Sequence, residues 1–330
     1  MIKGVKLVKP ASYIVLILLL FLIPLFVKDA YYIHILIIVG INVILASSLR
    51  TIATTGQFSL AHAGFMAIGA YTSALLVMKL GLSFWVALPL GGIAAGLLAL
   101  LIGYPFVRVK RVYFAMLTLF AGEVIRLVIV EWKALTGGST GLTNVPPPNP
   151  LVIPGLLNIT FTSKVPYYYL VLILVLITLL FLYRIERTRI GAIFMAIQQG
   201  DSIVESVGIN TAGYKVLALC IGCFFAGIAG SFYAHYILVV SPSSFTVMQT
   251  IYMLVYVTVG GRRGFFGAAL GALVLTLIPE AFRVLKEYQP IIFAVILLVI
   301  IFYLPEGLTS LPKLVRSKMA KPSKGSLTNA

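Results

Sequence analysis

The alternation of long apolar runs with short clusters of Lys and Arg constrains this chain more than any other feature. Ten runs are long enough, or nearly so, to cross a membrane: residues 11–27, 31–49, 58–78, 84–107, 112–132, 166–183, 214–238, 245–259, 264–282 and 290–304. Lipid leaves backbone polar groups to be satisfied within each segment, so runs of this kind fold as helices. The eighth run, of about 15 residues, is short enough to be a broken or half-crossing helix.

These runs predict an all-α polytopic membrane protein with about ten transmembrane helices and both termini on one side. A hydrophobic share of 61% and a mean hydropathy of +1.08 agree with that class. We therefore expect an N-terminal segment at residues 1–10, a transmembrane domain at 11–308 and a basic tail at 309–330. Residues 133–165 form the longest polar connection and are rich in Gly, Pro, Ser and Thr.

The distribution of positive charge predicts the orientation of the chain. With the N-terminus in the cytosol, 18 of the 25 Lys and Arg residues fall at cytosolic positions and 6 outside, with Arg126 inside a span. This asymmetry follows the positive-inside rule and places both termini in the cytosol, with residues 133–165 external. The net charge of +16 thus reflects membrane topology, and we expect no nucleic-acid partner.

Residues 184–215 are a polar island between two spans and are predicted to form a helical hairpin in the cytosol. Ile193 and Ile197 fall on one face of a first short helix, with Ala196 beside them. Asp201 is placed to cap a second short helix, and Gly208 to end it. Such a hairpin suits docking of a soluble partner, the exposed apolar face entering a groove; the alternative is an ordinary loop.

Charged and polar groups within the predicted spans are costly and need an explanation. Glu123 and Arg126 are three residues apart on one helix, so we expect a structural ion pair that faces the bundle. Gln57, Ser59 and His62 give the third span a polar start. For His62 a hydrogen-bonded packing role is favoured over proton relay, because no intramembrane acid lies nearby in sequence.

Several motifs of energy-using and catalytic proteins are absent from the sequence. It has no G-x-x-x-x-G-K-[ST] loop for ATP, no H-E-x-x-H metal motif and no G-x-S-x-G nucleophile turn. We expect no catalytic residues, metal or cofactor on this chain, which is interpreted as a transport pathway without its own energy source. A stand-alone channel or facilitator for urea, amides or other small polar solutes is the alternative, and it has no use for a docking hairpin.

Four stretches, in order, carry a resemblance to a known family. They are TGQFSLAHAGF at 55–65 followed by GAY at 69–71; Thr118-Leu119, Glu123, Arg126 and Trp132 with LTGGSTGL at 135–142; GAIFMAIQQGDSIVESVG at 191–208; and VGG at 259–261 with GAALGA at 267–272. The chain resembles the integral-membrane permeases of bacterial ABC importers for branched-chain amino acids, in particular the LivM-type subunit. The resemblance covers about residues 43–308.

The resemblance implies a set of partners and a location. The partners are a homologous permease subunit, two ATP-binding cassette subunits that hold the ATP, and a periplasmic or lipid-anchored substrate-binding protein, all at the bacterial inner membrane. Residues 184–215 then correspond to the ATPase-coupling loop, whose expected interface residues are Arg189, Gly191, Ile193, Ala196, Ile197, Asp201, Glu205 and Gly208. Candidate pathway or packing residues are Gln57, Ser59, His62 and Tyr71.

Overall fold

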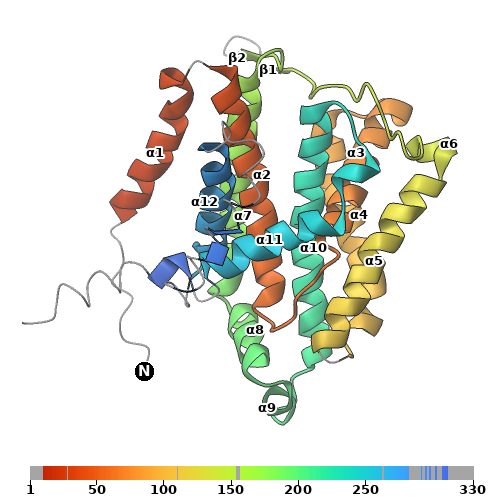
Figure 1. The fold of residues 1–330 in the computed structure, drawn as a ribbon, viewed down its shortest axis with the longest axis vertical. Helices are drawn as coiled ribbons and strands as arrows, with labels where there is room; N and C mark the ends of the chain where they lie inside the picture. Colours follow the sequence, from red (N-terminus) through yellow and green to blue (C-terminus); the bar gives the residue numbers. More distant parts are fainter. Residues whose placement is uncertain are drawn as a thin grey trace, which may run out of the picture.

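The computed structural model describes residues 10–27, 29–109, 111–153, 157–261 and 264–281, together with 291, 294–295, 297–298, 302 and 307–310. These residues form a bundle of helices, several of them long and roughly parallel (Figure 1). Nearly all of the predicted N-terminal segment, most of the tenth run, the turn at 262–263 and the basic tail beyond 310 lie outside the described residues.

Six helices are long and apolar enough to span a membrane: α2 (Ala30–Ala53), α3 (His62–Leu80), α4 (Phe84–Phe106), α5 (Arg111–Glu131), α7 (Lys164–Glu186) and α10 (Thr211–Ile237). Three apolar helices are shorter: α1 (Pro10–Phe26), α11 (Val247–Gly260) and α12 (Gly267–Ala281). At 1.5 Å per residue the 14 residues of α11 cover about 21 Å, less than the hydrocarbon thickness. The shortness expected of the eighth run is confirmed, whereas the count of ten spans stays a prediction.

The core of the bundle is built around α2 and α10. Helix α10 packs against α3, α4 and α2, and α2 also contacts α7, α11 and α12. In Figure 1 the short helix α11 crosses the long helices at a steep angle rather than running with them. Helix α1 lies at the edge of the bundle, where Tyr168 Oη donates a hydrogen bond to the carbonyl of Leu20 at 2.8 Å.

Glycines allow the central helices to approach closely, as small residues four positions apart commonly do in membrane helices. A Cβ on Gly92 of α4 would lie 2.8 Å from Ile228 of α10, and Gly96 one turn later faces the same helix. On α12, a Cβ at Gly271 would overlap the backbone of α11. Substituting Gly271 would therefore force α11 and α12 apart, whereas at Gly92 the side chain of Ile228 would have to move.

The third span begins at His62, so the prediction that it begins near Phe58 was wrong. Helix α2 ends at Ala53, where the hydroxyl of Thr55 donates to the carbonyl of Ile52 at 2.8 Å and competes with helix continuation. Gly56 then adopts a left-handed conformation with φ of +79°. The chain therefore enters the bundle as an irregular segment rather than as helix.

The two ends of the bundle carry different structures (Figure 1). At one end, the 133–165 connection contains α6 (Lys133–Thr136) and a hairpin of β1 (Leu151–Ile153) with β2 (Leu157–Ile159), a small departure from an all-helical fold. At the other end, α8 (Arg189–Gln199) and α9 (Asp201–Glu205) connect α7 to α10. The short 3-10 helices η1 (Pro242–Ser244) and η3 (Leu308–Ser310) complete the described elements.

Candidate functional site

Helices α8 and α9 form the predicted hairpin, with Gly200 between them. Asp201 was expected to cap α9, but it is the first residue of that helix, and its carboxylate accepts a hydrogen bond from Lys215 Nζ at 2.6 Å instead. Gly208 has a φ of +80°, and its N–H donates to the carbonyl of Glu205 at 2.9 Å. The glycine therefore ends the hairpin in the left-handed conformation that was predicted.

The inner face of α8 is buried against the chain's own bundle. Gly191, Phe194 and Ile197 are buried, with Ile197 fully inaccessible. Gln198 Nε2 donates to the carbonyl of Ala53 at 3.3 Å. The prediction that Ile197 belongs to an exposed face was therefore wrong, because the apolar stripe of this amphipathic helix packs on its own membrane domain.

The hairpin nevertheless exposes three apolar side chains, one on α8, one on α9 and one in the turn that follows α9. Met195 is 43% exposed, Ile203 69% and Val207 71%. We call these three residues the docking face, after the docking role that was expected of the hairpin. Ile193 and Ala196 are half-buried, whereas Arg189 and Glu205 are exposed at the two ends of the hairpin. Sequence reasoning missed the docking face because its members lie outside the regular apolar stripe of α8.

Two polar contacts tie the hairpin to the start of α10. One is the Asp201–Lys215 ion pair, in which the lysine side chain is 9% exposed. In the other, Thr211 Oγ1 donates to Glu205 Oε1 at 2.5 Å. These contacts join residues 14 and 6 positions apart, so α9 is held against the helix that follows it.

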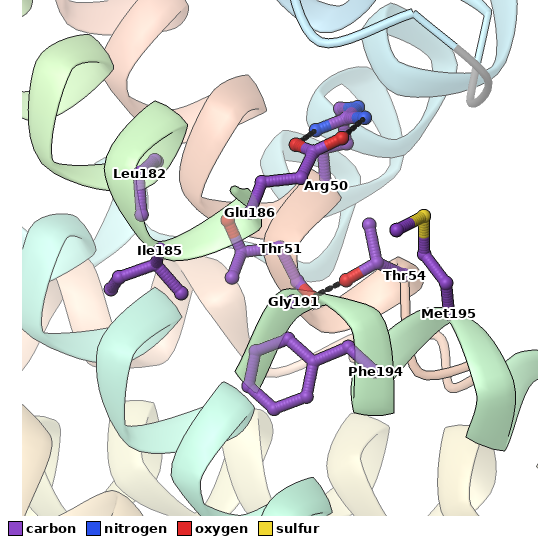
Figure 2. A pocket seen from close by; sticks show the side chains of 9 residues that line it. All are labelled: Arg50, Thr51, Thr54, Leu182, Ile185, Glu186, Gly191, Phe194 and Met195. Atoms are coloured by element: carbon purple, nitrogen blue, oxygen red, sulfur yellow. Dashed lines mark hydrogen bonds and ion pairs between the residues drawn. The ribbon is translucent and has the colours of Figure 1, made fainter. Parts of the chain in front are cut away.

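A third contact connects the hairpin to α2. The guanidinium of Arg50 donates from Nη1 and Nη2 to the two carboxylate oxygens of Glu186, at 2.7 and 3.0 Å. Glu186 is the last residue of α7, and α8 begins three positions later. Beside the pair lies a small pocket where α2, α7 and α8 meet (Figure 2). It is lined by Arg50, Thr51, Thr54, Leu182, Ile185, Glu186, Gly191, Phe194 and Met195.

The predicted pathway or packing residues lie in the interior of the bundle. Gln57, Ser59 and His62 are at most 1% exposed, and His62 Nε2 lies 2.8 Å from Ser48 Oγ. This contact confirms that His62 is hydrogen-bonded. Tyr71 is separated from these groups by two and a half turns of α3 and donates to the carbonyl of Val240 at 3.0 Å. The structure therefore does not gather the four residues into one site.

Gln57 Oε1 and His62 Nδ1 are buried and have no hydrogen-bond partner within the described part of the chain. Buried polar atoms are usually satisfied by protein or by ordered water. The stretch of backbone around Gln57 and His62 is held by side chains from two other helices. Thr118 Oγ1 of α5 accepts a hydrogen bond from the N–H of Leu60, and Thr250 Oγ1 of α11 accepts one from the N–H of Ala63, each at 3.0 Å.

The expected Glu123–Arg126 ion pair is present on α5. Arg126 Nε lies 2.9 and 3.1 Å from the two carboxylate oxygens, and Nη2 also contacts Oε1. The pair was expected to face the bundle. Its side chains are 35% exposed for Glu123 and 26% for Arg126, so it lies at the edge of the exposed face of α5 beside Phe120 and Leu127.

Six long apolar helices packed around a buried centre define a multi-pass membrane protein, with a polar hairpin at one end of the bundle. A family model described as "branched-chain amino acid transport system / permease component" matches residues 31–304, and the chain belongs to this family.

Curated relatives agree with the family. The chain is 30% identical over 299 residues to the Escherichia coli high-affinity branched-chain amino acid transport system permease protein LivM, covering 84% of this chain and 67% of that protein. It is 23% identical over 248 residues to the probable branched-chain amino acid transport permease protein LivM of Methanocaldococcus jannaschii, covering 69% and 70% of the two chains. No solved structure matches the chain significantly.

Proposed function

We propose that this chain is the membrane-spanning permease subunit of an ATP-driven, binding-protein-dependent importer for branched-chain or related amino acids. The observation that carries this proposal is the family match over residues 31–304, together with relatives named as branched-chain amino acid permeases. The same match supports this function over the stand-alone facilitator for urea or amides.

The orientation follows from the charge distribution. The hairpin end of the bundle faces the cytosol, as do both termini, and the β1–β2 end faces outward in the bacterial inner membrane. A substrate-binding protein would deliver cargo at the β1–β2 end. The pathway would run between this subunit and a homologous permease, and ATP would bind only to two partner ATPase subunits.

The hairpin is the surface on which we place ATPase docking. A helical hairpin whose inner face is fixed to the bundle and which exposes apolar side chains elsewhere fits a groove on a soluble partner. The docking face, Met195, Ile203 and Val207, provides the apolar contacts. Exposed Arg189 and Glu205 lie at the rim, where charges affect orientation and association rate more than affinity.

Inward-facing residues of the hairpin have a different role in this proposal. Gly191, Ile197 and Asp201 hold α8 and α9 to the membrane domain, so movement imposed on the docking face is transmitted rather than absorbed locally. Nucleotide binding on the ATPases would then bias a two-state rearrangement of the bundle.

Reconstitution of the complete complex tests the function. The chain, a second permease and two ATPases are placed in proteoliposomes, and uptake of radiolabelled leucine, isoleucine and valine is measured with and without ATP and binding protein. We expect uptake only when both are present. ATP-independent uptake of these amino acids, or of urea, at channel-like rates would instead establish a facilitator.

A further inference from the structure

The Arg50–Glu186 contact is a buried ion pair in a chain with few charged residues. The Arg50 side chain is 4% exposed and that of Glu186 24%. Bringing two charges out of water is costly, and replacing such a pair by apolar residues is often neutral or stabilising. Stability of the bundle alone therefore gives little reason for the pair.

The geometry of the pair fixes both distance and orientation. A guanidinium that bonds both carboxylate oxygens, here at 2.7 and 3.0 Å, cannot rotate about the contact without losing one bond. Only Arg187 and Thr188 separate Glu186 from the first residue of α8. The ion pair thus determines where α8 begins relative to α2.

Arg50 also contacts a third part of the bundle. Its guanidinium carbon lies 5.5 Å from the ring centroid of Phe265, in the connection between α11 and α12, and Phe265 packs edge-on against Tyr183 of α7 at 5.2 Å. Helix α2 itself packs against α7, α10, α11 and α12. A displacement delivered at Arg50 therefore reaches most of the helices that form the core.

The close packing at this junction has a gap on one side. A Cβ on Gly191 would overlap the backbone of Glu186, so the first turn of α8 is in tight contact with the end of α7. One turn later, Phe194 and Met195 line the small pocket together with Thr51 and Thr54 (Figure 2). Helix α8 is thus fixed at its start, and a space of about the size of one water molecule remains between it and α2 beside the ion pair.

We propose that the Arg50–Glu186 ion pair is the joint that positions α8 against α2 and through which movement of the hairpin reaches the core of the bundle. This inference rests on the proposed function, because it assigns a positioning role within ATP-coupled transport. Without the joint, the turn between α7 and α8 yields, and the ATPases cycle with less movement of the pathway.

The test measures the amount of cargo moved per ATP hydrolysed by the complete complex in proteoliposomes. Glu186→Gln keeps the shape of the side chain and removes its charge. We expect the complex to assemble and hydrolyse ATP, while cargo per ATP falls at least about fivefold, the lower end of typical coupling between sites. Arg184→Gln, which alters an exposed arginine in the last turn of α7, is the matched control and should leave the ratio unchanged.

An unchanged ratio in Glu186→Gln, or an equal fall in Arg184→Gln, would overturn the inference. Should Glu186→Gln fail to assemble, Arg50→Glu alone is compared with Arg50→Glu combined with Glu186→Arg. Recovery of assembly and of cargo per ATP in the reversed pair supports the joint, and no recovery overturns it. Absence of ATP-dependent uptake by the unaltered complex would instead contradict the proposed function, so the two failures are distinguishable.

Discussion

Truncation of Ile203 should weaken ATPase docking by an amount that the structure allows us to estimate. Ile203→Ala removes three carbons, worth ~0.8 kcal/mol each on burial. Ile203 is 69% exposed, and only this exposed fraction can be newly buried by a partner. Multiplying the transfer free energy by this fraction gives a loss of binding free energy of about 1.7 kcal/mol, or about fifteenfold in affinity. The same reasoning for Val207→Ala, with two carbons and 71% exposure, gives about sixfold.

The assay is a binding titration of labelled ATPase subunits against the membrane subunits in nanodiscs. Val239→Ala is the matched control, because Val239 is 41% exposed and follows the opposite end of α10 from the hairpin. Its dissociation constant should equal that of the unaltered protein. Alanine is a good helix former, so α9 should persist in Ile203→Ala.

Docking affinity that stays within twofold in both Ile203→Ala and Val207→Ala would refute the assignment of the docking face. Ile197→Asp is a poor test of docking, because it would bury an unpaired carboxylate inside the membrane subunit and destabilise its fold. A loss of uptake in that variant would therefore not distinguish docking from folding.

Three further predictions concern the hairpin, the topology and the source of energy. Gly208 has a φ of +80°, and no atom lies near the position that a Cβ would occupy. Gly208→Val should therefore cost about 1–2 kcal/mol of stability through backbone conformation alone and lower uptake. Asparagine tolerates this conformation, so Gly208→Asn should keep the uptake of the unaltered protein. A cysteine at exposed Ser139 should react with a membrane-impermeant thiol reagent in intact cells and one at exposed Gln199 should not; the reverse pattern would invert the orientation. The isolated chain in liposomes should neither hydrolyse ATP nor conduct amino acids, and rapid flux through it would favour a facilitator.

Sequence alone predicted most of the helical elements and the division of the chain between two ends of a bundle. Apolar runs in lipid have few alternatives to helix, and a polar island between two of them must lie at an end. The Glu123–Arg126 pair was predictable for the same reason, since residues three apart on one helix are neighbours whatever surrounds them.

Only the tertiary structure decided which side of each helix meets which neighbour. Periodicity identified an apolar stripe on α8 but not whether a partner or the chain's own bundle covers it, so the burial of Ile197 and the exposure of Ile203 could not be foreseen. The irregular start of the third span depends likewise on Thr118 and Thr250. These threonines lie on helices distant in sequence, and their hydroxyl oxygens accept hydrogen bonds from the backbone N–H groups of this segment.

The Arg50–Glu186 joint shows the limit most clearly. Its members are 136 positions apart, and each alone looks like an ordinary charge at the end of a span. Their contact exists because α2 and α7 pack side by side, which places the ends of both helices at the same depth. Local sequence specifies the helices and their ends, whereas contacts between distant ends depend on the packing order of the bundle.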